Sequence, residues 1–378
     1  MLKIAYSDLI INNTPLPGMS YDGTTLTVEF DDEFFRRCKA VFSPVQSFKC
    51  TTADCFCKKE LVSCRECFKN GVYARYILED NDSKWIRGLR KNIIDKTDDF
   101  TKRARHFVLD LRDDILEVVA FNMEITKTMR VAAHRGFSEK YPENTMAAFR
   151  AAIEAGVDEI ETDVRVTADG ELVLIHDEMA DRTTDGTGKI CEMTLEELKK
   201  LDAGVKKGAE FAGERIPTLR ELMELVKDHP TLTLDIELKE YPTEGREALA
   251  YDVCDRALAM LDEYGFTERC VINSWNGKLN EYVHEKYGKK YRQHVYYPEE
   301  YLGKCTVDPY SYAYCACLFT NNPEPYDYLR SRGVQPWVGA GVKDEVTLDK
   351  AIANGACAVT CNNPDEILAL LRKKGLHK

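Results

Sequence analysis

The chain has 378 residues, with 64 acidic against 52 basic side chains and a formal net charge of -12 at pH 7. This length exceeds one ordinary hydrophobic core, so we expect one large barrel with an appendage or two domains. The acidic balance disfavours nucleic acid as a partner, because phosphate backbones require clustered Lys and Arg. No stretch is apolar for long enough to cross a bilayer and residues 1–8 lack an apolar export segment, so we expect a cytoplasmic protein without a transmembrane segment.

Residues 1–125 are expected to form a small, mainly β or α+β domain. Segments near residues 24–30, 72–76 and 107–111 alternate polar and apolar residues or are rich in β-formers, with polar turns between them. The pattern does not reveal the function of this domain. A homodimer contact is the simplest role, and binding of a substrate headgroup or a membrane surface are the alternatives.

Cysteines are dense in this first domain, where five of them lie within residues 50–67. Cys64-x-x-Cys67 has the spacing of a zinc knuckle, whereas Cys55-x-Cys57 is a poorer match. A structural zinc ion held by these four thiols is therefore one interpretation. Because the spacings do not form two Cys-x-x-Cys pairs, we favour thiols without a metal.

Residues 130–378 alternate strand-like and helix-like segments joined by short connections. Strands are predicted near residues 130–133, 159–166, 172–175, 232–238, 270–273, 293–296, 314–319, 334–338 and 356–360. Helices are predicted over 144–155, 219–227, 247–264, 278–287, 326–332, 346–354 and 364–373. A repeated β-then-α order over about 250 residues predicts an α/β protein with a (β/α)8 TIM barrel. A doubly wound open sheet is the alternative.

Reactive side chains stand at the ends of several of these strands. They are His134 and Arg135 on the first strand, Glu161 and Asp163 on the second, His176 after the next, and Glu237 with Lys239 on the one that follows. In a TIM barrel the carboxyl ends of the strands meet at one rim, so these groups are expected to form one site. Residues two apart on a strand share a face, which directs each pair of charges to the same side.

The three carboxylates of this set predict a cation. Alone, Glu161-x-Asp163 is typical of a solvated strand end, and Glu237-x-Lys239 of a surface ion pair. Converging in one barrel mouth, they would repel one another unless a cation lay among them. Ligation by oxygen alone suits Mg2+ or Ca2+ better than zinc, which prefers histidine or cysteine.

Several motifs in this half of the chain resemble the glycerophosphodiester phosphodiesterase family. They are His134-Arg135-Gly136, Pro142-Glu143-Asn144-Thr145, Glu161-x-Asp163, His176-Asp177, Arg182-Thr183-Thr184, Ile236-Glu237-Leu238-Lys239, Ser274-Trp275 and Trp337. The resemblance covers about residues 130–375 and leaves residues 1–125 out. It implies a barrel with an insertion over its mouth at about residues 178–230.

The resemblance also implies an activity and a role for each site residue. His134 and His176 would be the acid/base pair, Glu161, Asp163 and Glu237 would hold one divalent cation, and Arg135 and Lys239 would contact phosphate. The reaction would be hydrolysis of a small glycerophosphodiester to glycerol 3-phosphate and an alcohol, with a cyclic phosphate as the expected intermediate.

Two other functions stay open. One is a phospholipase D-like activity on lysolipids, which predicts an apolar groove at the barrel mouth, and the other is a noncatalytic binding module on the same barrel. Trp337 and Trp275 are each expected either to pack against glycerol or to be a barrel-core or rim aromatic, and for Trp275 we favour the second. Departures from the family pattern at Val338-Gly339 and Cys361-Asn362 bear on the alcohol and the polarity of the pocket rather than on the reaction.

Overall fold

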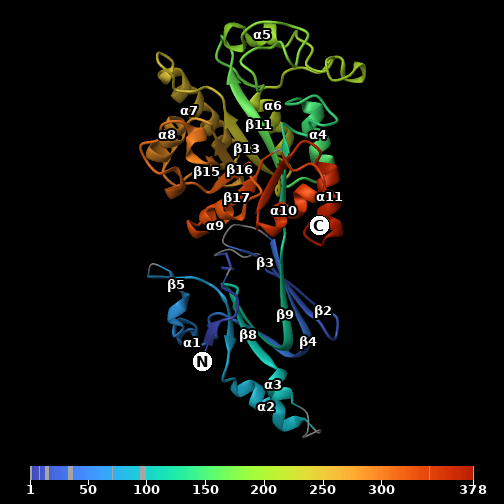
Figure 1. Ribbon diagram of the computed structural model, residues 1–378, viewed down its shortest axis with the longest axis vertical. Helices are drawn as coiled ribbons and strands as arrows, with labels where there is room; N and C mark the ends of the chain where they lie inside the picture. Colours follow the sequence, from blue (N-terminus) through green and yellow to red (C-terminus); the bar gives the residue numbers. More distant parts are fainter. Residues whose placement is uncertain are drawn as a thin grey trace. The chain divides into compact units, whose positions relative to one another are not determined.

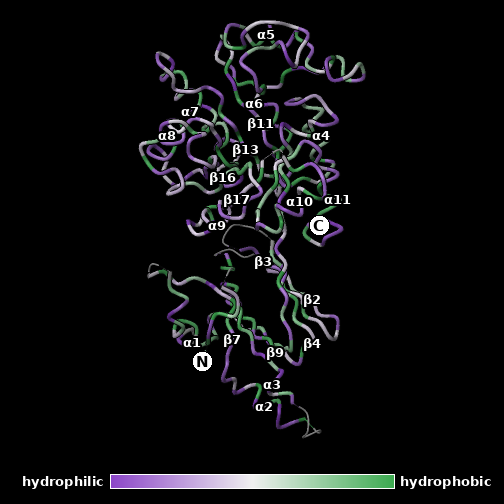
Figure 2. The backbone as a smooth tube through the Cα atoms, viewed as in Figure 1, coloured by the Kyte–Doolittle hydropathy of each residue, from purple (hydrophilic) through white to green (hydrophobic). Residues whose placement is uncertain are grey.

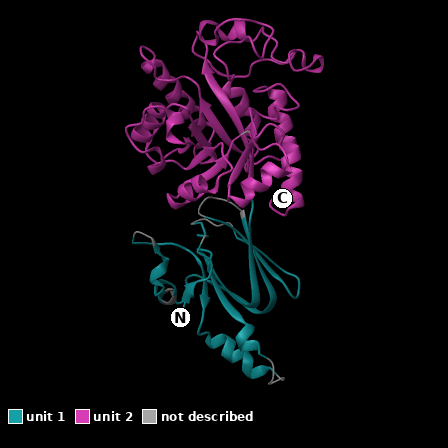
Figure 3. Cartoon of the chain, viewed as in Figure 1, with its two compact units in different colours: residues 1–128 teal, residues 129–378 magenta. Residues whose placement is uncertain are grey.

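The structure is a computed structural model that describes residues 2–7, 9–12, 17–32, 37–69, 71–93, 99–339 and 341–377. The chain divides into two compact units, residues 1–128 and 129–378 (Figure 3). No helix in the described ranges is long and apolar enough to cross a membrane.

Unit 1 is built on a seven-stranded antiparallel sheet, as the alternating segments of the sequence predicted. Its order is β1 (Leu2–Ile4), β7 (Ile77–Asp80), β8 (Arg105–Asp110), β9 (Asp114–Lys127), β4 (Arg37–Thr52), β3 (Leu26–Asp31) and β2 (Gly18–Tyr21). Hydrophobic and hydrophilic residues are interspersed along these strands in Figure 2. On β3 the apolar positions Leu26, Val28 and Phe30 are buried, because alternate side chains point to the same face of a sheet.

Shorter elements complete unit 1. They are α1 (Lys58–Val62), the 3-10 turn η1 (Arg65–Cys67), a hairpin of β5 (Phe68–Lys69) and β6 (Val72–Tyr73), and the helices α2 (Lys84–Asn92) and α3 (Phe100–Arg103). Ser83 caps α2, since its side chain accepts a hydrogen bond from the amide of Ile86.

Unit 2 is a closed barrel of eight parallel strands, which confirms the predicted TIM barrel (Figure 1). The strands are β10 (Arg130–His134), β11 (Glu159–Val166), β13 (Thr233–Leu238), β14 (Cys270–Asn273), β15 (Arg292–Tyr297), β16 (Cys315–Leu318), β17 (Gln335–Val338) and β18 (Ala358–Cys361). Strand β10 pairs with both β11 and β18, and this closes the barrel. The helices are α4 (Met146–Ala155), α6 (Leu219–Val226), α7 (Glu247–Glu263), α8 (Gly277–Tyr287), α9 (Pro323–Ser331), α10 (Glu345–Ala353) and α11 (Pro364–Lys373).

One predicted strand does not belong to the barrel wall. Strand β12 (Leu172–Leu174) pairs antiparallel with β11, through a tight turn in which the amide of Thr167 donates to the carbonyl of Glu171. Such a short connection cannot carry a parallel crossover, which needs about a dozen residues or more. The hairpin instead brings the chain back along β11, where the amide of Ile175 donates to the carbonyl of Asp163 at 3.1 Å.

The insertion between β12 and β13 is shorter than the predicted residues 178–230. It contains the 3-10 turns η2 (Ile190–Glu192) and η3 (Ala209–Phe211) and the short helix α5 (Leu195–Leu198), with an apolar cluster of its own. Helix α6, however, buries Leu219, Leu222 and Val226 in the main core of the barrel. The end of the predicted insertion at about residue 230 is therefore wrong, because these apolar residues at helical spacing face the barrel.

Candidate active site

Strand register brings the predicted carboxylates together. In the parallel ladders His134 lies opposite Glu161, and Asp163 lies opposite Glu237. One oxygen from each of Glu161, Asp163 and Glu237 lies within 4.8 Å of the others, and no other His, Cys, Asp or Glu cluster of this kind occurs among the residues that the structure describes. All three side chains are buried. Three oxygen donors at this spacing fit a hard divalent cation.

Two cations of the protein flank this carboxylate cluster. The Lys239 Nζ lies 3.1 Å from an oxygen of Asp163 and donates a hydrogen bond to Glu237. The Arg135 Nε lies 3.2 Å from the other oxygen of Asp163. Burial acts to raise the pKa of Asp163, but the charges of Lys239 and Arg135 hold that pKa below its ordinary value.

The other two carboxyls respond in the opposite direction. Burial, followed by the negative charges of Asp163 and Glu237, raises the pKa of Glu161 well above its usual range. Burial likewise raises the pKa of Glu237 to about 7, against the lowering effect of Lys239. Burial therefore favours the neutral form of both carboxyls, and additional positive charge such as a bound cation would favour their ionised form.

His134 is held at the end of β10 by a residue from the last barrel strand. Its Nδ1–H donates a hydrogen bond of 2.7 Å to the side-chain oxygen of Asn362, the residue directly after β18. The same oxygen accepts a hydrogen bond of 3.2 Å from the hydroxyl of Ser138. With the proton on Nδ1, Nε2 carries the free lone pair, and it lies 4.0 Å from a carboxylate oxygen of Glu161. Burial, and then the charge of Arg135, lower the pKa of His134.

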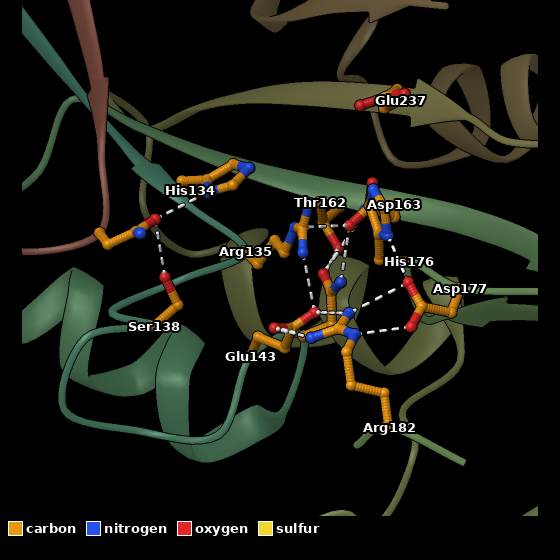
Figure 4. Close-up of polar contacts among 12 residues, drawn as sticks. His134, Arg135, Ser138, Glu143, Thr162, Asp163, His176, Asp177, Arg182 and Glu237 are labelled. Carbon is orange, nitrogen blue, oxygen red and sulfur yellow. Dashed lines mark hydrogen bonds and ion pairs between the residues drawn. The ribbon is translucent and has the colours of Figure 1, made fainter. Parts of the chain in front are cut away.

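His176 is held through a chain of ion pairs (Figure 4). Its Nδ1–H donates to Asp177 at 2.6 Å, and the guanidinium of Arg182 donates to the same carboxylate. Arg182 also forms two 2.7 Å hydrogen bonds to Glu143, which accepts from Arg135 at 2.9 Å. The Arg182 hydrogen bond holds the pKa of Asp177 well below its usual range, so this carboxylate stays ionised, while burial lowers the pKa of His176.

This chain of contacts includes residues to which sequence reasoning gave no role. Glu143 and Arg182 link the phosphate-binding candidate Arg135 to His176, and Asn362 orients His134. The motifs Pro142-Glu143-Asn144-Thr145 and Arg182-Thr183-Thr184 were the signal for the first two. Asn362 was visible only as a departure from the family pattern.

The loop after β10 is shaped by left-handed backbone at two non-glycine residues. Arg135 has φ 58° and Asn144 has φ 54°, and the amide of Asn144 donates to the carbonyl of Arg135 at 3.0 Å. Specific hydrogen bonds offset this strain: the Arg135 amide donates to Glu161 at 2.8 Å, and the Asn144 side chain to Asp163 at 2.8 Å. Gly136, with φ 76°, is required for space as well, because a Cβ there would lie 2.8 Å from the backbone of Ala148.

A cavity of about 270 Å³ joins these groups. Among its lining residues are His134, Arg135, Glu161, His176, Glu237 and Lys239 on the β10, β11 and β13 side, and Asn273, Trp275, Tyr296 and Phe319 on the β14 to β16 side. A larger surface groove of about 800 Å³ contains none of these residues.

Trp337 is not among the residues that line this cavity. Its ring is fully buried in a small cluster with Val271 and Cys315, and its Nε1–H donates to Gln335 at 2.9 Å. Because its ring is fully buried and does not line the cavity, the structure gives no support to a substrate contact by Trp337. Trp275 lines the cavity, which fits a rim aromatic or a ring that packs against substrate rather than a core residue.

The four thiols proposed to bind zinc in unit 1 are not brought together as a metal site. Cys64 and Cys67 are buried, whereas Cys55 and Cys57 are exposed. No cluster of metal-ligating atoms among the described residues includes any of these four thiols. The predicted dimer contact through residues 1–125 stays a prediction.

Solved structures place the barrel in a class of enzymes. A glycerophosphodiester phosphodiesterase from Agrobacterium tumefaciens is 25% identical, with a TM-score of 0.53 over 64% of this chain and 99% of that one. An Oleispira antarctica phosphodiesterase in complex with the product sn-glycerol-3-phosphate is 27% identical, with a TM-score of 0.55 over 65% of this chain and 97% of that one. The barrel is thus similar to those of TIM-barrel phosphodiesterases.

Sequence comparison identifies the family. The model of the glycerophosphoryl diester phosphodiesterase family matches residues 134–344. A glycerophosphodiester phosphodiesterase from Caldanaerobacter subterraneus is 39% identical over 256 residues, which are 65% of this chain and 98% of that relative. One from Bacillus altitudinis is 33% identical over 221 residues, 57% of this chain and 79% of that relative. The chain therefore belongs to the glycerophosphoryl diester phosphodiesterase family and is a phosphoric diester hydrolase.

Proposed function

We propose that this enzyme hydrolyses a small glycerophosphodiester to glycerol 3-phosphate and an alcohol, with one Mg2+ or Ca2+ ion held by Glu161, Asp163 and Glu237. The observation that carries the proposal is the cavity in which two imidazoles, each with its Nδ1 fixed by an acceptor, flank this carboxylate cluster. The Oleispira phosphodiesterase, whose structure contains sn-glycerol-3-phosphate, supports the choice of product.

The positive side chains bind the phosphate in this proposal. Arg135 and Lys239 line the cavity beside Asp163, and they bind the nonbridging oxygens of the phosphodiester. The bound cation supplies further positive charge against the negative charge that develops in the transition state. Arg135 is fixed by Glu143 and Asp163, so its guanidinium needs no reorganisation when the substrate arrives.

His134 and His176 divide the proton transfers. One Nε2 accepts the proton of the attacking oxygen and the other donates a proton to the departing alcohol, in either order. We favour the 2-hydroxyl of the glycerol as the attacking group, which gives a cyclic phosphate first, because a neighbouring hydroxyl is already in place. A phosphodiester of propane-1,3-diol lacks this hydroxyl and should be hydrolysed far more slowly; an equal rate would assign the attack to water.

The central test is hydrolysis of glycerophosphocholine, measured by release of glycerol 3-phosphate. We expect activity with Mg2+ or Ca2+, its loss in excess EDTA, and its loss in His134→Ala and Glu161→Gln. His229→Ala, which changes a histidine outside the cavity lining, is the matched control. Full activity in excess EDTA would refute the cation, and near-normal turnover by His134→Ala would refute the acid/base assignment.

A further inference from the structure

Four aromatic side chains form a corner on one side of the barrel mouth. Trp275, after β14, stacks on Tyr296 of β15 with ring centroids 3.7 Å apart. Phe319, directly after β16, lies 5.7 Å from Trp275 at an interplanar angle of 19°. Tyr301, in the 3-10 turn η5 (Glu299–Leu302), is tilted against both, with centroids 5.8 Å from Trp275 and 5.9 Å from Phe319. We call these four residues the aromatic corner.

The aromatic corner is continuous with the proposed catalytic cavity. Trp275, Tyr296 and Phe319 line that cavity together with His134 and Glu237. Phe319 and Tyr301 remain 51% and 46% exposed, which is unusual for large rings that already have aromatic neighbours. The mouth therefore has a charged half on β10, β11 and β13 and an aromatic half on β14, β15 and β16.

Gly339 makes room for the exposed ring of this corner. A Cβ at Gly339 would lie 2.5 Å from Cε1 of Phe319 and 3.0 Å from Sγ of Cys317. The backbone of Gly339 is not in the left-handed region, so space rather than conformation requires glycine there. Gly339 also departs from the family pattern, at a position that bears on the alcohol rather than on the reaction.

The surroundings of the corner favour a compact cation over a long apolar chain. Trp275 and Tyr296 cover one face of each other, so the accessible ring surface of the corner is chiefly that of Phe319 and Tyr301, and no Lys or Arg among the described residues lies over these two rings. The exposed carboxylates Glu299 and Glu300 precede Tyr301, and the exposed amides Asn321 and Asn322 follow Phe319. The apolar patch is thus bounded by polar and acidic groups.

We propose that the aromatic corner binds a quaternary ammonium group on the leaving alcohol, so that the preferred substrate is the glycerophosphodiester of a trimethylammonium alcohol. The inference rests on the proposed function, since the charged half of the mouth must hold the phosphate. Quaternary ammonium groups are attracted to the negative faces of aromatic rings, and the half-exposed rings of Phe319 and Tyr301, which stand at 69° to each other, offer two such surfaces at one place.

A charge-free isostere of the substrate isolates this attraction. Glycerophosphocholine and the glycerophosphodiester of 3,3-dimethylbutanol have nearly the same shape, and only the first carries the positive charge. We expect kcat/KM to favour the choline ester by roughly 3- to 30-fold, the range of a partly desolvated cation–π contact. The double variant Tyr301→Leu/Phe319→Leu should bring this ratio close to one. Tyr328→Leu, at a 39% exposed tyrosine that does not line the cavity, should preserve the ratio.

Three results would overturn the proposal. A kcat/KM ratio near one between the two esters in the wild type would show that the positive charge of the alcohol does not contribute. An equal loss on both esters and on glycerophosphoglycerol in the double variant would place the rings against the shared glycerol. A preference for a lysophospholipid that the double variant abolishes would assign the corner to an acyl chain.

A binding measurement separates this inference from the proposed function. Titration of the wild type with choline alone, followed by calorimetry, should give weak saturable binding that the double variant weakens at least several-fold. Binding of choline without hydrolysis of any phosphodiester would refute the proposed function and leave the ammonium site in place. Hydrolysis without choline binding, and with a ratio near one, would refute only the ammonium site.

Discussion

Acidification should weaken the affinity of the metal-free enzyme for Mg2+ by a predictable amount, because protons and the cation compete for the same buried carboxyls. The pKa of Glu237 is about 7 and that of Glu161 is raised well above its usual range, both chiefly by burial. Asp163 adds no proton, since Lys239 and Arg135 keep its pKa low against the effect of burial. Each displaced proton costs a factor of about ten in affinity for every pH unit below its pKa.

The expected change is large enough to measure. Between pH 7 and pH 5, competition from the proton of Glu237 weakens the affinity by about 50- to 100-fold, and a proton on Glu161 weakens it further. The pKa values of Glu161 and Glu237 are raised in the metal-free fold. The metal-free fold is therefore stabilised at low pH and loses this stabilisation as pH rises through about 7. Binding of the cation recovers the loss.

Calorimetric titration with Mg2+ in buffers of different ionisation enthalpy counts the protons released. We expect between one and two near pH 6, and about one fewer in Glu161→Gln. Glu178→Gln, at an exposed carboxylate, is the control and should leave the count unchanged. A dissociation constant that is the same at pH 5.5 and pH 7.5 would refute this account of the site.

Three further predictions concern the groups around the carboxylates. His176→Ala should lower kcat by roughly 10²–10⁴, and near-normal turnover would contradict its role in proton transfer. Burial lowers the pKa of both His134 and His176, yet one of the two must carry a proton for the reaction. We therefore expect kcat/KM at saturating cation to fall as pH rises above 6.5, and a profile that rises between pH 7 and pH 8 would contradict this. Asn362→Leu removes the acceptor for Nδ1 of His134 and should cost roughly 10- to 100-fold in kcat, whereas Asn362→Asp keeps an acceptor and should cost less; equal losses would count against the hydrogen bond. Gly136→Ala should destabilise the fold by more than about 1–3 kcal/mol in chemical denaturation, and by more than Gly213→Ala, which has a positive φ but open space around it.

The repeated strand–helix pattern of the sequence was sufficient to predict the barrel. Apolar strands alternate with amphipathic helices in residues 130–378. The hydrophobic pattern of a buried strand is the same whether its neighbour is parallel or antiparallel. That is why β12 was recognised as a strand but placed in the wall of the barrel: hydrophobic pattern reports burial, not the direction of pairing. The tight turn at residues 167–171 carried the missing information, since so short a connection permits only an antiparallel partner.

The aromatic residues mark a second limit of sequence reasoning. Trp337 and Trp275 both stand near the ends of predicted strands, and nothing local distinguishes them. Trp337 is fully buried and does not line the cavity, whereas Trp275 lines it two residues beyond β14. Which ring meets a ligand depends on the stagger of neighbouring strands, which is a property of the closed barrel.

By itself the sequence determined the candidate reacting groups of this protein: two histidines, three carboxylates, an arginine and a lysine, set at strand ends where a barrel gathers them. Residue type and spacing suffice for this, because chemistry and strand periodicity are local properties. The tertiary structure alone decided how these groups are held, through the chain from Arg135 by Glu143 and Arg182 to His176, and through Asn362, 228 residues beyond His134. Contacts between residues so far apart in the sequence form only when the barrel closes. Closure also places the aromatic half of the mouth opposite the charged half.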